Sequence, residues 1–483
     1  MPSIAHVKTV VVLALIVDLL AFTIPLPLFP RIIEWYTQKE LGDTNGLLYR
    51  TLASIRSLQT WLHGGVLNSR RQWDVVLLGG FLGSVFSVLQ FVVSPWIGSL
   101  SDAYGRKPIL LISMIGNIVS AVVWMQSTSF TSFLLARATG GFSEGNVQLS
   151  IAILSDVTEP ANRARALALV GLAFALCFST GPVLGAYFAQ RPFPLTIGPF
   201  AHVDLNIYAT PAALTVILLT VETIFLVFFL PETRGYVLPK LPGSSSEKKS
   251  LSTEAEVDED TGFVHAPAVT GSSGTVQQRL TILNLLRWTH FAFLSVFSGV
   301  EFTLTFLTFD LFDWNNSQNG RMLAFIGVIS ALLQGGYVRR SIRKTGEGVM
   351  ARRGVMSCVV SFAVLAVLPH AGTSGPRIIY AAAVCLAYTS ATVVNSLTAL
   401  ASLQCDEPSN DPSSVFDRDP RLLKGRALGE FRSAGQLGRA IGPLLACAAY
   451  WTVGPSFTYG VSALAMFALS SAMRRIAVKP KTE

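Results

Sequence analysis

The sequence predicts an all-α membrane protein whose twelve transmembrane helices form two pseudo-symmetric six-helix bundles. Hydrophobic residues make up 51% of the 483 residues and charged residues only 14%, whereas a soluble globular protein carries about 25% charged residues. Apolar runs of the roughly 20 residues that a helix needs to cross a bilayer recur along the chain. A polar segment divides these runs into two equal sets. Together these observations argue against a soluble protein.

The first apolar run could be a signal peptide, but it is longer than the 7–15 residues of a signal-peptide core, and no small-residue cleavage site follows it. We therefore expect it to be the first transmembrane helix. The predicted helices cover residues 7–29, 75–97, 108–127, 130–153, 165–189, 208–230, 287–310, 321–338, 354–370, 376–403, 426–451 and 455–473.

We divide the chain into an N-terminal bundle at residues 1–235, a linker at 236–285 and a C-terminal bundle at 286–483. The linker is rich in Ser, Glu, Gly and Pro and poor in residues that build a core, so we expect a disordered tether. Phosphorylation or partner binding there is the alternative. An internal repeat supports the division, because Arg-Ala-Leu is followed sixteen positions later by Gly-Pro in both the fifth and the eleventh helix.

Lysine and arginine residues in the short loops fall almost entirely on one side of the predicted helices, which the positive-inside rule assigns to the cytoplasm. Both termini and the linker are therefore expected there. The loop at 31–73 lies on the other side and contains "LLYRTLASIRSLQTWLHG", which favours an interfacial amphipathic helix over a lid. Asn315 begins an Asn-Asn-Ser sequon in another external loop and is a candidate for glycosylation. No sorting motif identifies the membrane.

Several function classes are disfavoured. The formal net charge of +8 follows the membrane topology and forms no basic patch interleaved with aromatics, so no nucleic-acid partner is expected. The five cysteines are scattered, so we expect neither a metal site nor a cofactor. Gly141-Phe-Ser-Glu-Gly145 matches the nucleophile elbow of hydrolases, but that elbow needs a strand, and this segment is a predicted membrane helix. We do not expect an enzyme.

A polar motif, "GSLSDAYGRK", separates the second and third helices. Gly98 permits close helix approach and Gly105 permits a turn. Asp102 can lie against a helix N-terminus or against Arg106. A loop that served only the positive-inside rule would need Arg106 and Lys107, but neither the glycines nor the aspartate.

This motif, in this position, resembles the signature of the major facilitator superfamily, with Ala103 in place of the usual basic residue. The resemblance implies a cytoplasmic latch between the two bundles. The equivalent loop, "RRSIRKTGEGVMARR" at residues 339–353, keeps basic residues and a glycine but lacks an aspartate. The sequence therefore does not predict a second latch at this loop.

Glycine and proline residues in the fifth helix, Gly181, Pro182 and Gly185, resemble a motif of the drug/proton antiporter branch of that superfamily. Gly442 and Pro443 form a comparable copy in the eleventh helix. Such residues bend a membrane helix and allow tight packing. Ordinary small-residue packing is an equally good interpretation of each copy alone.

Charged residues inside a membrane cost about 2.5–3.5 kcal/mol each at mid-helix and indicate function by default. Helical spacing places Arg137 and Glu144 on one face of the fourth helix, and Asp18 at a similar depth in the first, so an ion pair between Asp18 and Arg137 is feasible. Glu222, near the cytoplasmic end of the sixth helix, is expected to snorkel or pair. The candidates for proton coupling and substrate binding are Asp18, Arg137, Glu144, Glu301, Asn395 and Arg439.

In the resembled fold, the first, fourth, seventh and tenth helices line a central cavity, and five of these six candidates fall on them. The resemblance implies a secondary transporter that moves a small organic solute by alternating access, with proton-coupled antiport. Asp18, together with Glu144 or Glu301, would exchange the proton, and Arg137 and Arg439 would bind an anionic group. The expected partners are the solute, protons and the bilayer, and we expect a monomer. An uncoupled facilitator, or a transporter-fold receptor or scaffold, is the alternative.

Overall fold

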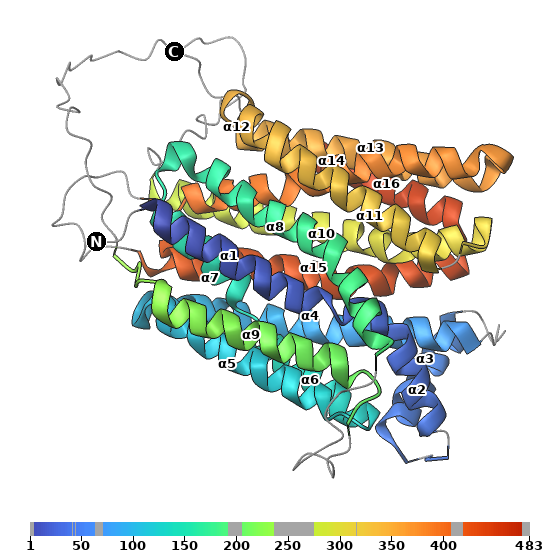
Figure 1. Ribbon diagram of the computed structural model, residues 1–483. Coiled ribbons are helices and arrows are strands. Elements are labelled where there is room, and N and C mark those ends of the chain that lie inside the picture. The colour runs from blue at the N-terminus through green and yellow to red at the C-terminus, as the bar shows by residue number, and fades with distance from the viewer. Residues whose placement is uncertain are drawn as a thin grey trace, which may run out of the picture.

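The structure, a computed structural model, describes residues 4–40, 42–43, 45–62, 71–191, 205–235, 275–314, 316–406 and 419–475. These residues form helices and no strands (Figure 1). The helices are α1 (Ile4–Thr23), α2 (Phe29–Lys39), α3 (Leu47–Leu62), α4 (Arg71–Tyr104), α5 (Arg106–Met125), α6 (Phe130–Ser143), α7 (Asn146–Asp156), α8 (Pro160–Ala189), α9 (Ala209–Phe229), α10 (Val276–Phe312), α11 (Asn316–Leu332), α12 (Arg339–Thr345), α13 (Glu347–Val367), α14 (Gly375–Leu403), α15 (Lys424–Thr452) and α16 (Pro455–Ala472), with a π-helical segment η2 (Leu333–Val338) between α11 and α12.

The predicted fold class, an all-α membrane protein with twelve transmembrane helices, is confirmed. Nine helices of the described ranges are each long and apolar enough to cross a membrane. The remaining crossings are the pair α6 and α7, together with α15 and α16. Three arginines and a glutamate lie among the apolar residues of α15 and lower its mean hydropathy, so α15 is not among these nine helices.

The first half contains α1 and α4 to α9, and the second contains α10 to α16. Within the halves, α1 packs on α8 and α10 packs on α15, which are equivalent pairs of the two six-helix sets. Between the halves, α4 lies along α15, and α8 contacts α11 and α14. Figure 1 shows α5, α6 and α9 on one side of this interface and α13, α14 and α16 on the other.

The predicted glycine and proline motifs lie at these equivalent helix pairs. A Cβ atom on Gly181 would lie 1.9 Å from the Thr23 hydroxyl, and one on Gly185 would lie 2.1 Å from the Ile24 carbonyl oxygen. In the second half, a Cβ atom on Gly442 would lie 2.2 Å from the Ser295 carbonyl oxygen. Pro182 and Pro443 lie inside their helices, beside these contacts. Each motif therefore lets two helices touch backbone to backbone.

The C-terminal limit predicted for the linker, residue 285, is wrong, because α10 begins at Val276. Thr275 and Gln278 form a capping box there: the Gln278 N–H donates to the Thr275 hydroxyl, and the Thr275 N–H donates to the Gln278 side chain at 3.0 Å. This reciprocal pair satisfies two N–H groups of the first turn and starts the helix before the apolar run. The rest of the predicted linker, 236–274, lies outside the described residues, as does Asn315.

The predicted external loop at 31–73 contains two helices. In α2, Ile32, Ile33 and Tyr36 are fully buried, and the Tyr36 hydroxyl donates to the Ser127 carbonyl oxygen at 2.9 Å. The interfacial helix is present as α3, but its Leu48 is buried against the protein. Packing on the ends of the spanning helices, and not the membrane interface alone, therefore holds this segment.

We expect Gly185→Ala to lower the melting temperature of the purified protein, because the added methyl group would strike backbone at the contact between α1 and α8. Overpacking of this kind costs about 1–3 kcal/mol. Gly460→Ala is the matched control, since nothing lies within 4 Å of that Cβ position on α16. The two variants are compared by thermal unfolding in detergent, and equal melting temperatures would contradict the packing role.

Candidate functional site

The fourth crossing is interrupted where the sequence predicted a continuous helix over 130–153. The first part, α6, ends at Ser143, and α7 begins at Asn146. Glu144 lies between them with non-helical backbone angles (φ −72°, ψ 81°). Gly145 packs so closely that a Cβ atom would lie 2.8 Å from Ile97 and from Ser113. The break directs Glu144 and Asn146 into the interior of the first half.

Three buried carboxyl groups gather beside this break. Asp18 of α1 is 3% exposed, and the Asn146 side-chain amide donates to its Oδ1 atom at 2.7 Å. Glu144 accepts a hydrogen bond from the Asn117 amide at 3.3 Å. Glu222 of α9 is also 3% exposed and interacts electrostatically with both of the other carboxyl groups. We call Asp18, Glu144 and Glu222 the carboxylate cluster.

Asp18 and Arg137 do not form the ion pair that their similar depth makes feasible. The guanidinium carbon of Arg137 lies 4.9 Å from the ring centre of Phe29 and 4.4 Å from that of Phe86. A planar guanidinium stacks well on aromatic faces because it is weakly hydrated. Asp18 instead takes its hydrogen bond from Asn146, which the start of α7 presents. The aromatic contacts of Arg137 and the amide contact of Asp18 therefore take the place of this ion pair.

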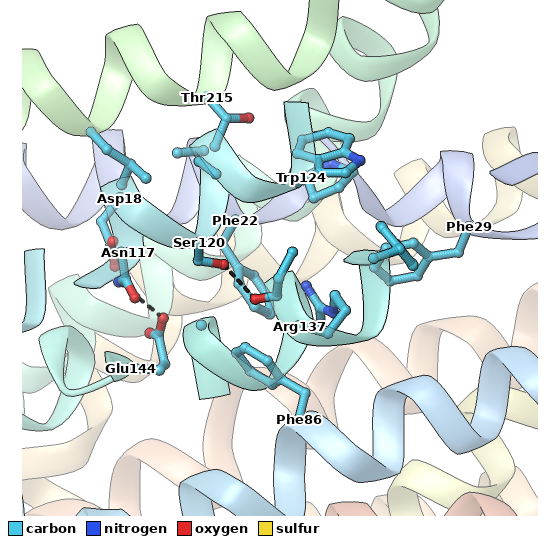
Figure 2. A pocket seen from close by; sticks show the side chains of 17 residues that line it. Asp18, Phe22, Phe29, Phe86, Asn117, Ser120, Trp124, Arg137, Glu144 and Thr215 are labelled. Carbon is cyan, nitrogen blue, oxygen red and sulfur yellow. Dashed lines mark hydrogen bonds between the residues drawn. The ribbon is translucent and has the colours of Figure 1, made fainter. Parts of the chain in front are cut away.

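Arg137 and the carboxylate cluster meet in a pocket inside the first half (Figure 2). Figure 2 shows Asp18, Asn117 and Glu144 toward one end of the pocket, with Phe29 and Trp124 toward the other. Neither Asp18 Oδ2 nor Arg137 Nε has a hydrogen-bond partner among the residues that the structure describes. The lining residues are Asp18, Ala21, Phe22, Pro25, Phe29, Phe86, Asn117, Ser120, Ala121, Trp124, Phe133, Ala136, Arg137, Gly140, Glu144, Thr215 and Leu219.

The other predicted site residues lie in the second half and do not line this pocket. Asn395 donates to the Gln334 side-chain oxygen at 3.2 Å. Glu301 and Arg439 are exposed and interact electrostatically with each other. The six candidates therefore divide into two groups of three, one in each half.

Sequence reasoning missed Arg432, whose charge acts on both Asp18 and Glu144 from the second half. It lies seven residues before Arg439, so the two arginines share one face of α15. That spacing was the available signal. It also missed Asn117 and Asn146, which carry no charge and are therefore less conspicuous in an apolar run. Glu222, expected to snorkel or pair, is instead buried, and its Oε2 atom has no hydrogen-bond partner in the described part of the chain.

At one end of the bundle, which we call the latch end, the predicted motif joins the two halves. Asp102 accepts hydrogen bonds from the backbone N–H groups of Gly425 and Arg426, at 2.9 and 2.7 Å, at the start of α15. It also pairs with Arg106 at 2.8 Å, so both predicted contacts occur. Gly98 packs so closely that a Cβ atom would lie 2.1 Å from the Gly425 carbonyl oxygen.

Further ion pairs extend this contact. Arg106 also binds Asp156 at 3.0 Å, while Lys424 lies 3.5 Å from Asp156 and 3.3 Å from Asp406. Arg163 of the first half binds Asp406 of the second half. Asp406, at the end of α14, thus supplies the second-half carboxylate that the loop at 339–353 lacks. We call Asp102, Arg106, Asp156, Arg163, Asp406 and Lys424 the latch network.

Glu232, which the sequence did not single out, caps the start of α5. It accepts hydrogen bonds from the backbone N–H groups of Arg106 and Lys107, at 2.8 and 3.0 Å. Gly105, with φ 108°, makes the turn that permits this. Partial burial raises the pKa of Glu232, but the N–H groups of Arg234, Arg106, Lys107 and Thr233 bind the ionised form and bring the pKa below its ordinary value.

No group of three or more histidine, cysteine, aspartate or glutamate side chains in the described ranges could hold a metal ion.

We expect Asp102→Asn to open the latch end, because the variant keeps the side-chain size but loses the charge that binds the start of α15. Spin labels on Ala161 and Arg421, exposed residues of the two halves, report this opening. The ratio of open to closed molecules should rise about tenfold for each 1.4 kcal/mol lost. Asp43→Asn, an exposed aspartate remote from the latch network, is the control. An unchanged distance distribution would exclude a role in closure.

We expect Glu232→Gln to lower the melting temperature at neutral pH and to have less effect at about pH 3. Because the folded protein lowers the pKa of Glu232, its ionised form stabilises the fold above the ordinary carboxyl pKa, and this contribution is lost as the pH falls through the lowered value. Thermal unfolding at both pH values tests this, with the exposed Glu34→Gln as control. Equal losses at both pH values would argue against the charge effect.

Known proteins resemble this chain over most of its length. It matches the profile of the Major Facilitator Superfamily over residues 11–443. It is 33% identical over 458 residues to Major facilitator superfamily domain-containing protein 10 of Mus musculus, which covers 94% of this chain and 90% of the relative. It is 22% identical over 294 residues to the class B tetracycline resistance protein of Escherichia coli, covering 61% of this chain and 64% of that protein.

A crystal structure of the human organic anion transporter MFSD10 (TETRAN) matches with a TM-score of 0.74 at 28% identity, covering 98% of this chain and 100% of that chain. The profile match, the sequence identity and the structural likeness all agree with the twelve-helix architecture. The chain is therefore a member of the major facilitator superfamily, a multi-pass membrane transporter and not an enzyme.

Proposed function

We propose that this transporter carries small organic anions with an apolar, preferably aromatic, body and couples their movement to protons. The observation that carries the proposal is Arg137, a half-buried cation that lies against two aromatic rings inside a pocket that also contains two carboxyl groups. Its Nε atom is buried and has no hydrogen-bond partner among the described residues. The name of the human structural relative, an organic anion transporter, supports the same substrate class.

The pocket suits such a solute chemically. Its lining combines one cation with five aromatic side chains, so an anionic head group can bind the guanidinium while an aromatic body packs on the rings. The aromatic residues are Phe22, Phe29, Phe86, Trp124 and Phe133. Arg432 and Arg439 present two further cations on one face of α15, and we assign them to the anion as it passes between the halves.

Proton coupling follows from competition for the arginines. Arg137 and Arg432 both act on Glu144. When Glu144 is ionised it neutralises them, and when it is protonated they are free to bind an anion. Binding of anion and binding of proton then favour each other, a linkage typically worth about 1–3 kcal/mol. We therefore propose that the anion and the proton move in the same direction.

Alternating access uses the contacts between the halves. Arg432 reaches the carboxylate cluster from the second half, so protonation of Asp18 or Glu144 weakens the attraction between the halves at the centre. The latch network closes one end independently of this attraction. By its many basic residues we propose that the latch end is cytoplasmic. Since one chain builds the whole pocket, we propose that the monomer is sufficient.

Proton antiport of a cationic solute is the second candidate. It is favoured by the unpartnered Oδ2 atom of Asp18, which could bind either a proton or a cation, and by the similarity to a tetracycline resistance protein. The two candidates require pH gradients of opposite direction. Anion uptake with protons is driven by acid outside the vesicle, whereas cation uptake by antiport is driven by acid inside it.

We expect purified protein in liposomes to accumulate radiolabelled naphthalene-1-sulfonate, whose charge is constant with pH, when the outside is acidic. Trimethylphenylammonium is the size-matched cation. Arg137→Gln should weaken sulfonate binding about 10- to 100-fold, because a hydrogen bond to a charged group contributes about 1.5–3 kcal/mol. The control is Arg191→Gln, at an exposed arginine, which should leave sulfonate binding unchanged.

Uptake of the cation driven by acid inside would favour antiport, and sulfonate flux without a response to the gradient would favour an uncoupled facilitator. Binding without flux would favour a receptor.

A further inference from the structure

Glu222 is a buried carboxyl group on α9 whose role the contacts among the described residues do not explain. It is 3% exposed, and its Oε2 atom has no hydrogen-bond partner among the described residues. A carboxyl group buried in a membrane helix costs free energy, and its presence there indicates a function. The charged groups that act on it are Asp18, from α1, and Glu144, from the junction of α6 and α7.

The position of Glu222 on α9 connects it to the pocket. Thr215, Leu219, Glu222 and Leu226 are buried and follow one another at spacings of three or four residues, so they lie along one face of the helix. Thr215 and Leu219 line the pocket. Glu222 therefore lies about one turn beyond the pocket on the face that closes it.

The depth of Glu222 places it between Asp18 and the latch end. The His6 ring nitrogen and the Phe229 carbonyl oxygen are 3.2 Å apart, which aligns the latch ends of α1 and α9. At 1.5 Å per residue, Asp18 lies about 18 Å from this level and Glu222 about 11 Å. Glu222 is thus about 7 Å nearer the latch end.

We propose that Glu222 is a proton relay between Asp18 and the water that reaches the latch end when that end opens. In this step the O–H bond at Asp18 breaks and an O–H bond forms at Glu222, so Asp18 becomes ionised and Glu222 neutral. Glu222 then loses the proton to water and returns to its ionised form. The proposal rests on the proton coupling proposed above.

The surroundings of Glu222 explain why the relay would not leak. Beyond it, Leu226 of α9 and Leu230, which directly follows α9, belong to one apolar cluster with Val7, Val10 and Val11 of α1. These side chains exclude water between Glu222 and the latch end while the latch network is closed. Each ionised carboxyl group disfavours ionisation of the other two, so the cluster shares protons among its members. Opening of the latch end would let one of these protons leave to water.

The test compares two fluxes of naphthalene-1-sulfonate in liposomes containing the full-length protein. One flux is driven by a proton gradient, and the other is exchange of labelled for unlabelled sulfonate at equal pH, which needs no net proton movement. We expect Glu222→Gln to reduce the gradient-driven flux about tenfold or more, because a proton-transfer group typically contributes a rate factor of at least that size. The exchange flux should be unchanged. Glu222→Asp should keep the gradient-driven flux with a shifted pH profile.

Glu34→Gln, the same substitution on the exposed face of α2, should change neither flux. A Glu222→Gln variant that matches the wild type in both fluxes would overturn the relay and leave the proposed function intact. Loss of both fluxes in Glu222→Gln would show a structural role and also overturn it. Wild-type flux that ignores the gradient, or no wild-type flux, would overturn the proposed function and the relay with it.

Discussion

The interruption of the fourth crossing between Ser143 and Asn146 determines the geometry of the pocket. In a regular helix, Arg137 and Glu144 would lie two turns apart on one face and could reach the same partners. The break turns Glu144 inward, presents Asn146 to Asp18 at 2.7 Å, and leaves Arg137 on the rings of Phe29 and Phe86. Arg137 therefore forms no direct ion pair with the carboxylates, and its guanidinium can bind an anionic solute once Glu144 is protonated.

This separation is unusual for buried charges, which are normally paired because desolvation is costly. Here several different groups together offset the cost of desolvation. Aromatic faces stabilise Arg137, amides donate to Asp18 and Glu144, and Arg432 contributes its charge from the other half of the molecule. A site balanced in this way responds to the addition of a proton or an anion, because each changes the charge that the remaining groups must offset.

The two halves meet through contacts of different kinds. At the latch end, a carboxylate binds a helix N-terminus, where partial positive charge accumulates, and glycines bring the backbones of α4 and α15 together. At the centre, the contact is electrostatic and depends on protonation. Within each half, Gly-Pro pairs lock α1 to α8 and α10 to α15. Rotation of two packed halves about a shared interface is a known route between two states of access.

The amino-acid sequence by itself determined the number of crossings, the division into equivalent sets and the latch motif. These depend on apolar run length and on local steric needs, such as the positive φ of Gly105, that are read without knowing any neighbour. It also located Asp18, Arg137 and Glu144, because charge in an apolar run is conspicuous.

Only the tertiary structure decided which of these groups touch. Arg432 and Glu222 lie far along the chain from Asp18, and their roles depend on packing between α15, α9 and α1. The helix break at Glu144 is likewise set by the packing of Gly145 against α4 and α5, which no local propensity specifies. Electrostatic partnership depends on distances in space, and in this chain the fold brings together charges more than 400 residues apart, such as Asp18 and Arg432.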